Sequence, residues 1–578
     1  MENASLKTNG YNKFPFIQLP GRVKTGWEQI IDFATGGDIK TITIDCYQGV
    51  FIDEIENAFE NKVLFIRTED FFKSEKEIRE MTQRDVTDDE VFGVISHLKM
   101  EDFLDEKKFK TFDESTSHAS ETIVVCGPGA SLFMKNANLR IYADMARWEI
   151  QKRMRKGMIN GLGVNNHTEP FNHQYKRGFF VDWRVCDKHK KAWFYQCDYF
   201  LDTNKVGEPK LVDMDIIRDG LRKAAHQPFS VVPFFDPGPW GGHWMEENLN
   251  LDHENAPNHA WCFNCVPEEN SLIFKIGDDF IELPSLDLVF FESSSLLGDT
   301  VEARFGKEFP IRFDFLDTMG GGNLSLQVHP DTTYIQENFG MNYTQDESYY
   351  LLDAKEDGTV YLGLKEDADL PAMFAELEHA EAKNASFDAE KYVNTYPAKK
   401  HDHFLIPAGT VHCSAQNTMV LEISSTPFIF TFKMWDWGRL GLDGKPRPIN
   451  LKHAKNVVKG ERRTRFVEKE LINQFLVVDQ GDGWVEEKTG LHELEFIETR
   501  RHWFSKPVLH QGNGSVNVMM LVDGDEAVVE SLDASFEPFV IHYAEAFIIP
   551  AAVQSYKISP HGMSQGKTIA TIKAYVRF

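Results

Sequence analysis

The sequence is poor in cysteine, in positive charge and in long apolar runs. Only 7 of its 578 residues are cysteines, an odd and scattered set that predicts reduced thiols rather than a disulfide framework. Basic residues number 62 against 89 acidic ones, and the net charge of -27 argues against a protein that coats nucleic acid. No apolar run is long enough to span a bilayer, and residues 1–14 lack the apolar core of a secretory signal. We therefore expect a cytoplasmic protein with no nucleic-acid or membrane partner.

One cysteine pair has a spacing that metal sites use. Cys262 and Cys265 form a CxxC motif, but a structural zinc site needs a second such pair or suitably placed histidines. Neither accompanies this motif. Two unlinked thiols are the preferred interpretation, with redox chemistry as a remote alternative.

The length and texture of the chain predict several domains. A hydrophobic fraction of 42% supports sizeable cores, and 578 residues correspond to about three domains. Residues 1–230 alternate β-branched strand-like pieces with helix-like ones, which predicts an α/β domain with a parallel sheet. A segment rich in Pro and Gly follows from Val231 and indicates a junction.

The remaining chain is dense in short strands with turn signals, which predicts antiparallel barrels or sandwiches. We expect one over residues 231–463, with a helical insertion at about 370–395, and another over residues 464–578. The stretch "AEAFIIPAAVQSYKIS" from Ala544 echoes "DHFLIPAGTVHCSAQ" from Asp402. That weak echo suggests two related barrels in tandem.

Four side chains within the first of these barrels could hold a metal ion. In "NLSLQVHPD", Gln327 and His329 point to the same side of a strand because side chains alternate faces. Glu347 and His412 each begin a further strand-like run, so the four could converge inside a barrel. Such a nitrogen and oxygen set suits zinc, and iron, manganese or cobalt would fit it too. Taken singly, either histidine is more often an ordinary residue at a strand end.

From about residue 233 onward the chain resembles the type I phosphomannose isomerases, zinc-dependent enzymes built from tandem cupins, which are jelly-roll β-barrels. The resemblance rests on "LSLQVHPD", "QDESYYLL", "DHFLIPAGTVHCS" and "FTFKMWDWGRLGLDGKPRPINLKHA". It implies a metal-dependent isomerase that interconverts mannose 6-phosphate and fructose 6-phosphate, or a related sugar phosphate. It also implies one zinc ion per chain, or another divalent transition metal, bound by Gln327, His329, Glu347 and His412.

The same resemblance suggests residues that meet the substrate. Ser325 corresponds to a serine near the substrate phosphate. Lys445 and Arg447 match the family's "GKPR" stretch and lie either near the sugar phosphate or at the surface. Lys433 replaces a catalytic arginine, keeping the charge but losing the bidentate fork. His259, in "HAWC", stands where the family has an acidic residue and is a candidate for substrate binding.

Several departures affect the substrate residues and leave the metal ligands intact. Besides Lys433 and His259, the chain has Gln345 where the family commonly has a lysine. The catalytic base is not evident, with His259 and Glu422 as candidates, and Glu422 is equally suited to a buried supporting role. A rival hypothesis is therefore a non-catalytic sugar or sugar-phosphate sensor that keeps the metal. A third hypothesis is an isomerase that acts on another sugar.

The first 230 residues resemble a uridine-kinase-type P-loop domain that has lost its P-loop. The strand "TITIDCYQGVFIDEI" is not followed by GxxxxGK[ST], so a triphosphate would have no amide cradle. The stretch "LRIYADMARWEIQKRMRKG" resembles the kinase strand and its arginine-rich lid helix, with Arg147, Arg153 and Arg155. Either this domain senses a ligand or binds a partner, or the helix is a solvated basic face on a scaffold, which is slightly preferred. A homo-oligomer is among the assemblies compatible with the sequence.

Overall fold

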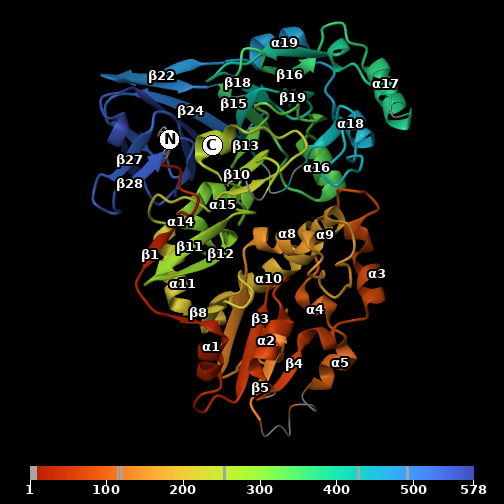
Figure 1. The fold of residues 1–578 in the computed structure, drawn as a ribbon, viewed down its shortest axis with the longest axis vertical. Helices are drawn as coiled ribbons and strands as arrows, with labels where there is room; N and C mark the ends of the chain where they lie inside the picture. The colour runs from red at the N-terminus through yellow and green to blue at the C-terminus, as the bar shows by residue number, and fades with distance from the viewer. Residues whose placement is uncertain are drawn as a thin grey trace, which may run out of the picture.

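The computed structural model describes residues 10–577 except 61, 113–115, 117–120, 252–255, 384, 426–427, 429, 490–491 and 493. Residues 1–9, which fall within the segment considered as a signal, lie outside this description. An α/β part forms one end of the molecule and two β-sandwiches form the other (Figure 1). Within the described part, the helices are all too short or too polar to cross a membrane.

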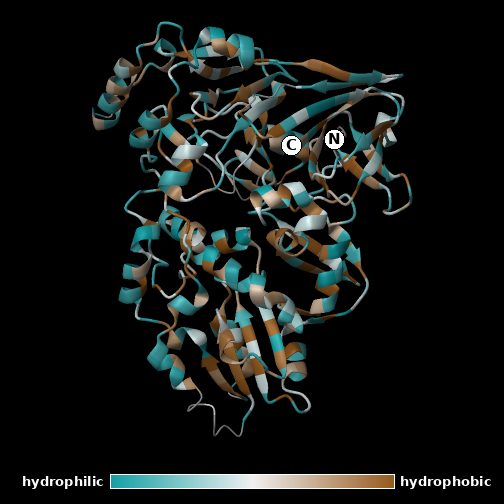
Figure 2. Ribbon diagram, turned by 180° about the vertical axis from the view of Figure 1, so that it is seen from behind, coloured by the Kyte–Doolittle hydropathy of each residue, from teal (hydrophilic) through white to brown (hydrophobic). Residues whose placement is uncertain are grey.

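The α/β part is built on a seven-stranded sheet in the order β2-β8-β7-β6-β3-β5-β4. The five strands from β7 to β4 are parallel, and β8 and β2 complete the sheet in antiparallel pairing. Hydrophobic residues mark these strands, whereas the surrounding helices carry hydrophilic ones (Figure 2). The strands are β2 (Val23–Thr25), β3 (Thr41–Cys46), β4 (Leu64–Arg67), β5 (Ile123–Gly127), β6 (Leu139–Asp144), β7 (Tyr199–Asp202) and β8 (Lys210–Asp213).

Helices cover this sheet and extend toward the sandwiches. The burial of β3 from Ile42 to Cys46 matches a strand covered on both faces. The helices are α1 (Gly26–Ala34), α2 (Ile52–Phe59), α3 (Glu75–Val86), α4 (Met100–Phe103), α5 (Glu106–Lys110), α7 (Ala130–Phe133), α8 (Arg147–Arg155), α9 (Phe171–Arg177), α10 (Trp183–Trp193) and α11 (Met214–Ala224).

The first sandwich pairs a six-stranded sheet, β18-β15-β20-β13-β10-β9, with a five-stranded sheet, β17-β16-β19-β14-β21. The helix expected at about 370–395 is present as α17 (Leu370–Lys383). The six-stranded sheet consists of β9 (Phe234–Asp236), β10 (Trp261–Cys265), β13 (Arg312–Asp317), β15 (Glu347–Ala354), β18 (His403–Ile406) and β20 (Thr418–Ser424). The other consists of β14 (Leu326–Val328), β16 (Thr359–Leu364), β17 (Val393–Pro397), β19 (His412–Ser414) and β21 (Phe432–Trp435).

The second sandwich repeats this strand order. Its sheets run β29-β26-β31-β24-β23-β22 and β28-β27-β30-β25, and each strand has a counterpart at the same place in the first sandwich. The strands of the sequence echo, β18 and β29, both lie at the end of their sheet. The strands are β22 (Leu476–Gly481), β23 (Trp484–Lys488), β24 (Ile497–Phe504), β25 (Val508–Gln511), β26 (Asn517–Asp523), β27 (Glu526–Ser531), β28 (Phe539–His542), β29 (Ala546–Ile549), β30 (Ser555–Pro560) and β31 (Ile569–Val576).

One predicted barrel segment belongs to neither sandwich. The stretch "SLIFKIGDDFIEL" forms the hairpin β11 (Ser271–Ile276) and β12 (Asp279–Pro284). It pairs instead with β1 (Ile17–Leu19) in a separate three-stranded sheet. The hairpin packs on α11, where Gly220 leaves room, because a Cβ there would lie 2.6 Å from the ring of Phe274. An apolar strand can pack against a helix as well as within a barrel wall. The sequence pattern alone therefore did not distinguish these two locations.

Further short helices connect these sheets. They include α12 (Trp244–Leu249), α13 (Leu286–Phe291), α14 (Ser293–Leu297), α15 (Asp299–Phe305), α16 (Thr332–Phe339), α18 (Leu451–Val457) and α19 (Thr464–Glu470). One buried apolar cluster runs without a break from the seven-stranded sheet into the first sandwich. The expected domain boundaries near residues 230 and 463 fall between the sheets and remain predictions.

Candidate metal centre and the adjoining cavity

Short strands of the five-stranded sheet position the candidate ligands. Gln327 on β14 lies opposite His412 on β19 and, on its other side, opposite Lys433 on β21. The alternation expected in this strand is present, because Leu326 and Val328 are fully buried in the apolar core. His329 directly follows β14, so it shares the direction of Gln327.

Three of the four predicted ligands meet at one point. His329 Nε2 lies 3.1 Å from one carboxylate oxygen of Glu347, and His412 Nε2 lies 2.7 Å from the other. Their candidate ligand atoms all lie within 4.8 Å of one another. Gln327 adjoins this group, with its side-chain nitrogen 3.3 Å from His412 Nε2. A half-turn of the amide would present the oxygen of Gln327 there instead.

The donor chemistry of this group fits a divalent cation. The Nδ1 atoms of His329 and His412 bond the backbone carbonyls of Phe430 and Thr410, at 2.9 and 2.8 Å. Each Nδ1 therefore carries the proton, and each Nε2 offers a lone pair. His329 Nε2 and one Glu347 oxygen are buried atoms without a hydrogen-bond partner among the described residues. Burial alone would raise the pKa of Glu347, but the charge and hydrogen bonds of His329 and His412, when their Nε2 atoms carry protons, lower it well below its ordinary value.

Gln345 holds the carboxylate of this group in place. Its amide nitrogen donates to Glu347 at 3.1 Å, and its amide oxygen accepts from the backbone N–H of Phe430 at 3.0 Å. Phe430 also supplies the carbonyl that orients His329. A residue noted in the sequence only for a missing charge thus connects two candidate ligands.

Replacing Gln345 with methionine should weaken metal binding by about 10–100-fold, the usual cost of losing a group that orients a ligand. The substitution removes both amide bonds and keeps a similar volume. Competition against a chelator of known affinity measures the change. Gln336→Met, on an exposed part of α16, is the control. Equal metal affinities in the two variants would contradict this role for Gln345.

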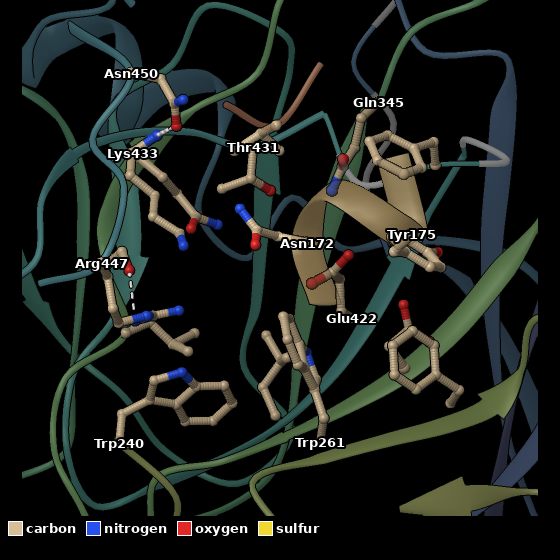
Figure 3. A pocket seen from close by; sticks show the side chains of 18 of the residues that line it. Asn172, Tyr175, Trp240, Trp261, Gln345, Glu422, Thr431, Lys433, Arg447 and Asn450 are labelled. Atoms are coloured by element: carbon tan, nitrogen blue, oxygen red, sulfur yellow. Dashed lines mark hydrogen bonds between the residues drawn. The ribbon is translucent and has the colours of Figure 1, made fainter. Parts of the chain in front are cut away.

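A cavity of about 250 Å³ adjoins the candidate metal centre (Figure 3). Gln327 and Gln345 belong to both. The wall combines six aromatic residues with eleven polar or charged ones, a mixture that suits a polar ligand. The lining residues are Val91, Phe171, Asn172, Tyr175, Trp240, Trp261, Phe263, Arg312, Asp314, Leu316, Leu324, Ser325, Gln327, Gln345, Glu422, Phe428, Thr431, Lys433, Arg447 and Asn450.

Positive charge gathers at one side of the cavity, where Lys433 and Arg447 lie (Figure 3). Arg447 donates to Asp436 at 2.8 Å and to Ser325 Oγ at 3.3 Å, and Ser325 itself donates to Asp436. Arg439 holds the same aspartate, so two arginines and one lysine stand against one carboxylate. Burial first, and then repulsion from Arg447, lower the pKa of Lys433 to about 7.

Two carboxyl groups lie on the opposite sheet. Asp314 on β13 is the direct cross-strand neighbour of Glu422 on β20, and both line the cavity. Burial raises the pKa of Asp314 to about 6 despite Arg312, whose guanidinium lies 3.3 Å from it. Burial, together with Glu347 and Asp314, raises the pKa of Glu422 well above its ordinary value. Burial thus shifts both carboxyl groups of the pair toward their protonated forms.

Other predicted site residues lie elsewhere. His259 packs against Phe235, 5.7 Å between ring centres, and is absent from the cavity wall. Lys445 is exposed in the loop after Gly444, whereas Arg447 two residues later lines the cavity. All seven cysteines, Cys262 and Cys265 included, are buried and unlinked.

The sequence interpretation missed Arg312 and Asp314. Their stretch, "RFDFLD", alternates charged residues with buried phenylalanines, so the signal used for Gln327 and His329 was also available here. No sequence pattern indicated that Phe171, Asn172 and Tyr175 line the cavity. It depends on how the α/β part packs against the first sandwich.

The three arginines of the predicted basic helix, α8, are all bound by other groups of the fold. Arg147 is buried in an ion pair with Asp187 at 2.7 Å. Arg153 donates to backbone carbonyls, and Arg155 makes two bonds to Asp236 on β9. Arg147 and Arg153 are therefore buried parts of the fold, whereas Arg155 stays exposed at the surface. A role of this domain in binding a ligand or a partner remains a prediction.

In the described part of the second sandwich, no equivalent set of ligands comes together. Glu347 faces Ile406, the residue before Pro407, and the corresponding position before Pro550 faces Asn517. Counted from the same two prolines, the place of His412 is taken by Ser555, which faces Gln511. Among the described residues, only the first sandwich brings three potential ligands together.

Comparisons with known proteins found one family model and several relatives. A family model described as a domain of unknown function (DUF8485) matches residues 26–226. A Bacillus subtilis protein named probable mannose-6-phosphate isomerase GmuF is 28% identical over 232 residues, which cover 40% of this chain and 68% of the relative. A mannose-6-phosphate isomerase of Streptococcus mutans is 24% identical, over 38% of this chain and 64% of the relative.

The fold was also compared with the crystal structure of the mannose 6-phosphate isomerase from Bacillus subtilis. The match covers 60% of this chain and 99% of that protein, with a TM-score of 0.48 and 19% identity. Over about 40% of its length, the chain is thus homologous to type I phosphomannose isomerases. The likeness of the first 230 residues to a P-loop kinase remains a prediction.

Proposed function

We propose that the protein is a metal-dependent aldose–ketose isomerase acting on a sugar phosphate, with mannose 6-phosphate and fructose 6-phosphate as the first candidate pair. The observation that carries the proposal is the junction of the metal centre with the cavity. Gln327 belongs to both, and the cavity wall adds cations for a phosphate and buried carboxyl groups for proton transfer.

A zinc ion, or another divalent transition metal, would be held by His329, Glu347 and His412, with Gln327 as a fourth ligand. Once bound, the cation would polarise the sugar oxygens and stabilise negative charge that develops on them. The buried histidine Nδ1 bonds and the Gln345 amide keep these ligands oriented.

Arg447 and Ser325 are our candidates for binding the phosphate. They lie together on the cationic side, and the guanidinium fork suits phosphate oxygens. Lys445 is not included because it is exposed away from the cavity. Lys433, beside Gln327 in the sheet, would stabilise the enediolate oxygen.

The proton shift needs a base and an acid, and Asp314 and Glu422 suit these roles. Asp314, with a pKa of about 6, is ionised at neutral pH and can take the proton from the sugar carbon next to the carbonyl. Glu422, whose pKa burial holds well above its ordinary value, is the candidate to donate a proton to the carbonyl oxygen. Asp314 then gives its proton to the former carbonyl carbon, and the hydroxyl on the neighbouring carbon gives its proton to Glu422 as the new carbonyl forms, with no redox partner.

The rival proposal is a non-catalytic sugar or sugar-phosphate sensor that keeps the metal. Lys433 and Gln345 favour it, since both depart from the residues expected in an active isomerase. A cytoplasmic location and a homo-oligomer remain predictions under either proposal.

An isomerase assay with metal analysis separates the two proposals. Metal-loaded full-length protein is offered mannose 6-phosphate and other hexose 6-phosphates, with formation of the ketose phosphate as the readout. We expect turnover and one metal ion per chain. A full metal complement without turnover on any of these sugars would leave only the sensor. Protein that binds no metal at all would contradict both.

A further inference from the structure

The cavity is closed by residues from outside the sandwich. Val91, Phe171, Asn172 and Tyr175 come from the α/β part, and the last three lie on or at the start of α9. In Figure 3, Lys433 and Arg447 lie to one side and Tyr175 to the other, with Asn172 projecting between them. Two parts of the chain far apart in sequence therefore share one ligand-sized space.

The α/β part is firmly docked against this sandwich. Phe92 stacks on Phe430 with ring centres 5.6 Å apart and an angle of 13° between planes. Asp89 lies 3.1 Å from His453 Nε2 on α18, and the N–H of Ile95 donates to a backbone carbonyl of α16 at 3.0 Å. Since Phe430 also carries the backbone groups that hold His329 and Gln345, the docking reaches the candidate metal centre.

Tyr175 forms a fixed wall of the cavity. Its hydroxyl donates to Glu269 at 2.5 Å, and its ring stacks on Phe428 and meets Trp183 edge-on. Phe171 stacks on the same ring, 5.8 Å between centres. These contacts leave little freedom for either aromatic ring to move aside for a longer ligand.

Asn172 presents an amide to the same space. Its nitrogen donates to Glu90 at 2.7 Å, which fixes the orientation of the side chain. The neighbouring residue, His173, points toward Glu90 from the outside and is absent from the cavity wall. The helix therefore offers a cavity position and an adjacent external one.

We propose that the α/β part supplies the specificity wall of the cavity, with Asn172 bonding a hydroxyl of a bound monosaccharide phosphate. Phe171 and Tyr175 set the length limit, so that one sugar ring or its open chain fits and a disaccharide phosphate is excluded. A volume of about 250 Å³ is in keeping with a ligand of that size. This inference rests on the proposed function for the identity of the ligand.

Binding of mannitol 1-phosphate, a polyol phosphate that cannot isomerise, tests the proposal without turnover. Calorimetry on the full-length, zinc-loaded protein compares wild type with Asn172→Ala and Asn172→Asp. Losing one hydrogen bond should weaken binding about 5–10-fold, and the added negative charge should weaken it further. His173→Ala and His173→Asp are the matched controls and should bind within twofold of wild type.

A second probe tests the length limit. Trehalose 6-phosphate, a disaccharide phosphate, should bind neither wild type nor the Asn172 variants, and Phe171→Ala should admit it. Metal content and thermal unfolding are measured on every variant. If Asn172→Ala were unfolded and Asn172→Asp were not, ligand binding by the nearly isosteric Asn172→Asp would decide whether residue 172 contacts the ligand.

The outcomes separate this proposal from the isomerase proposal. If wild type bound mannitol 1-phosphate without any turnover of hexose phosphates, and the Asn172 variants lost that binding, the specificity wall would stand and the isomerase proposal would be rejected. If wild type showed turnover but the Asn172 variants bound mannitol 1-phosphate as well as the His173 controls do, only the proposal of a specificity wall would be rejected. A wild type that does not bind mannitol 1-phosphate, or that binds trehalose 6-phosphate equally well, would also overturn it.

Discussion

His329→Ala is expected to remove the bound metal and to lower kcat/KM by about 10³-fold, since a catalytic cation supplies several kcal/mol of charge stabilisation. His329 is fully enclosed, its Nδ1 is fixed by the Phe430 carbonyl, and its Nε2 is turned toward Glu347. No other imidazole among the described residues can take its place beside Glu347 and His412. Metal analysis and steady-state kinetics on the same preparation measure the two losses.

His403→Ala is the matched control, because His403 is also fully buried in this sandwich but bonds the carbonyl of Thr489. We expect it to lower thermal stability and to keep one metal ion per chain. Metal retained by His329→Ala, or lost equally from both variants, would show that the three clustered side chains do not form the site.

Lys433→Met should lower kcat by on the order of 10²-fold while the metal stays bound, as expected when one group that stabilises a developing oxyanion is removed. Lys433→Arg should restore most of the rate because it restores the charge at this position. Only the charged form of Lys433 can stabilise the oxyanion in this way. Its pKa is lowered to about 7, so the charged fraction falls as pH rises through that value.

The wild-type kcat/KM should therefore decline above about pH 7, and Lys433→Arg should not show this decline, because the guanidinium stays charged. A pH profile of both proteins measures the difference. An unchanged rate in Lys433→Met would remove this residue from the mechanism. A complete loss in Lys433→Arg would instead show that the lysine has a role of its own, such as moving a proton.

The sequence predicted those parts of the site that a single strand encodes. Alternation in "NLSLQVHPD" was enough to place Gln327 and His329 on the same side, because side-chain direction in a strand is a local property. The same rule applied to "RFDFLD" would have found Arg312 and Asp314. Lys445 and Arg447 were indistinguishable in sequence because they lie in an irregular loop, where no period fixes direction.

Features of the site that depend on packing between distant parts of the chain could not be predicted from the sequence. Asn172 lines the cavity only because the α/β part docks beside Phe430, and neither stretch of sequence carries a sign of the other. The arginines of α8 illustrate the same limit. Their charge was plain, but their partners, such as Asp187 and Asp236, lie elsewhere in the chain.

The small sheet of β1, β11 and β12 bears on how the protein is made. β1 runs parallel to β11, whose first residue follows Ile17 by 254 positions (271 − 17). At 5–20 residues per second of synthesis, β1 must wait roughly 13–50 s for its partner to leave the ribosome. The seven-stranded sheet, complete by Asp213, can form during that interval with the leading strand still free. Once β11 has emerged, it can pair with the leading strand, long before the strands of the second sandwich are made.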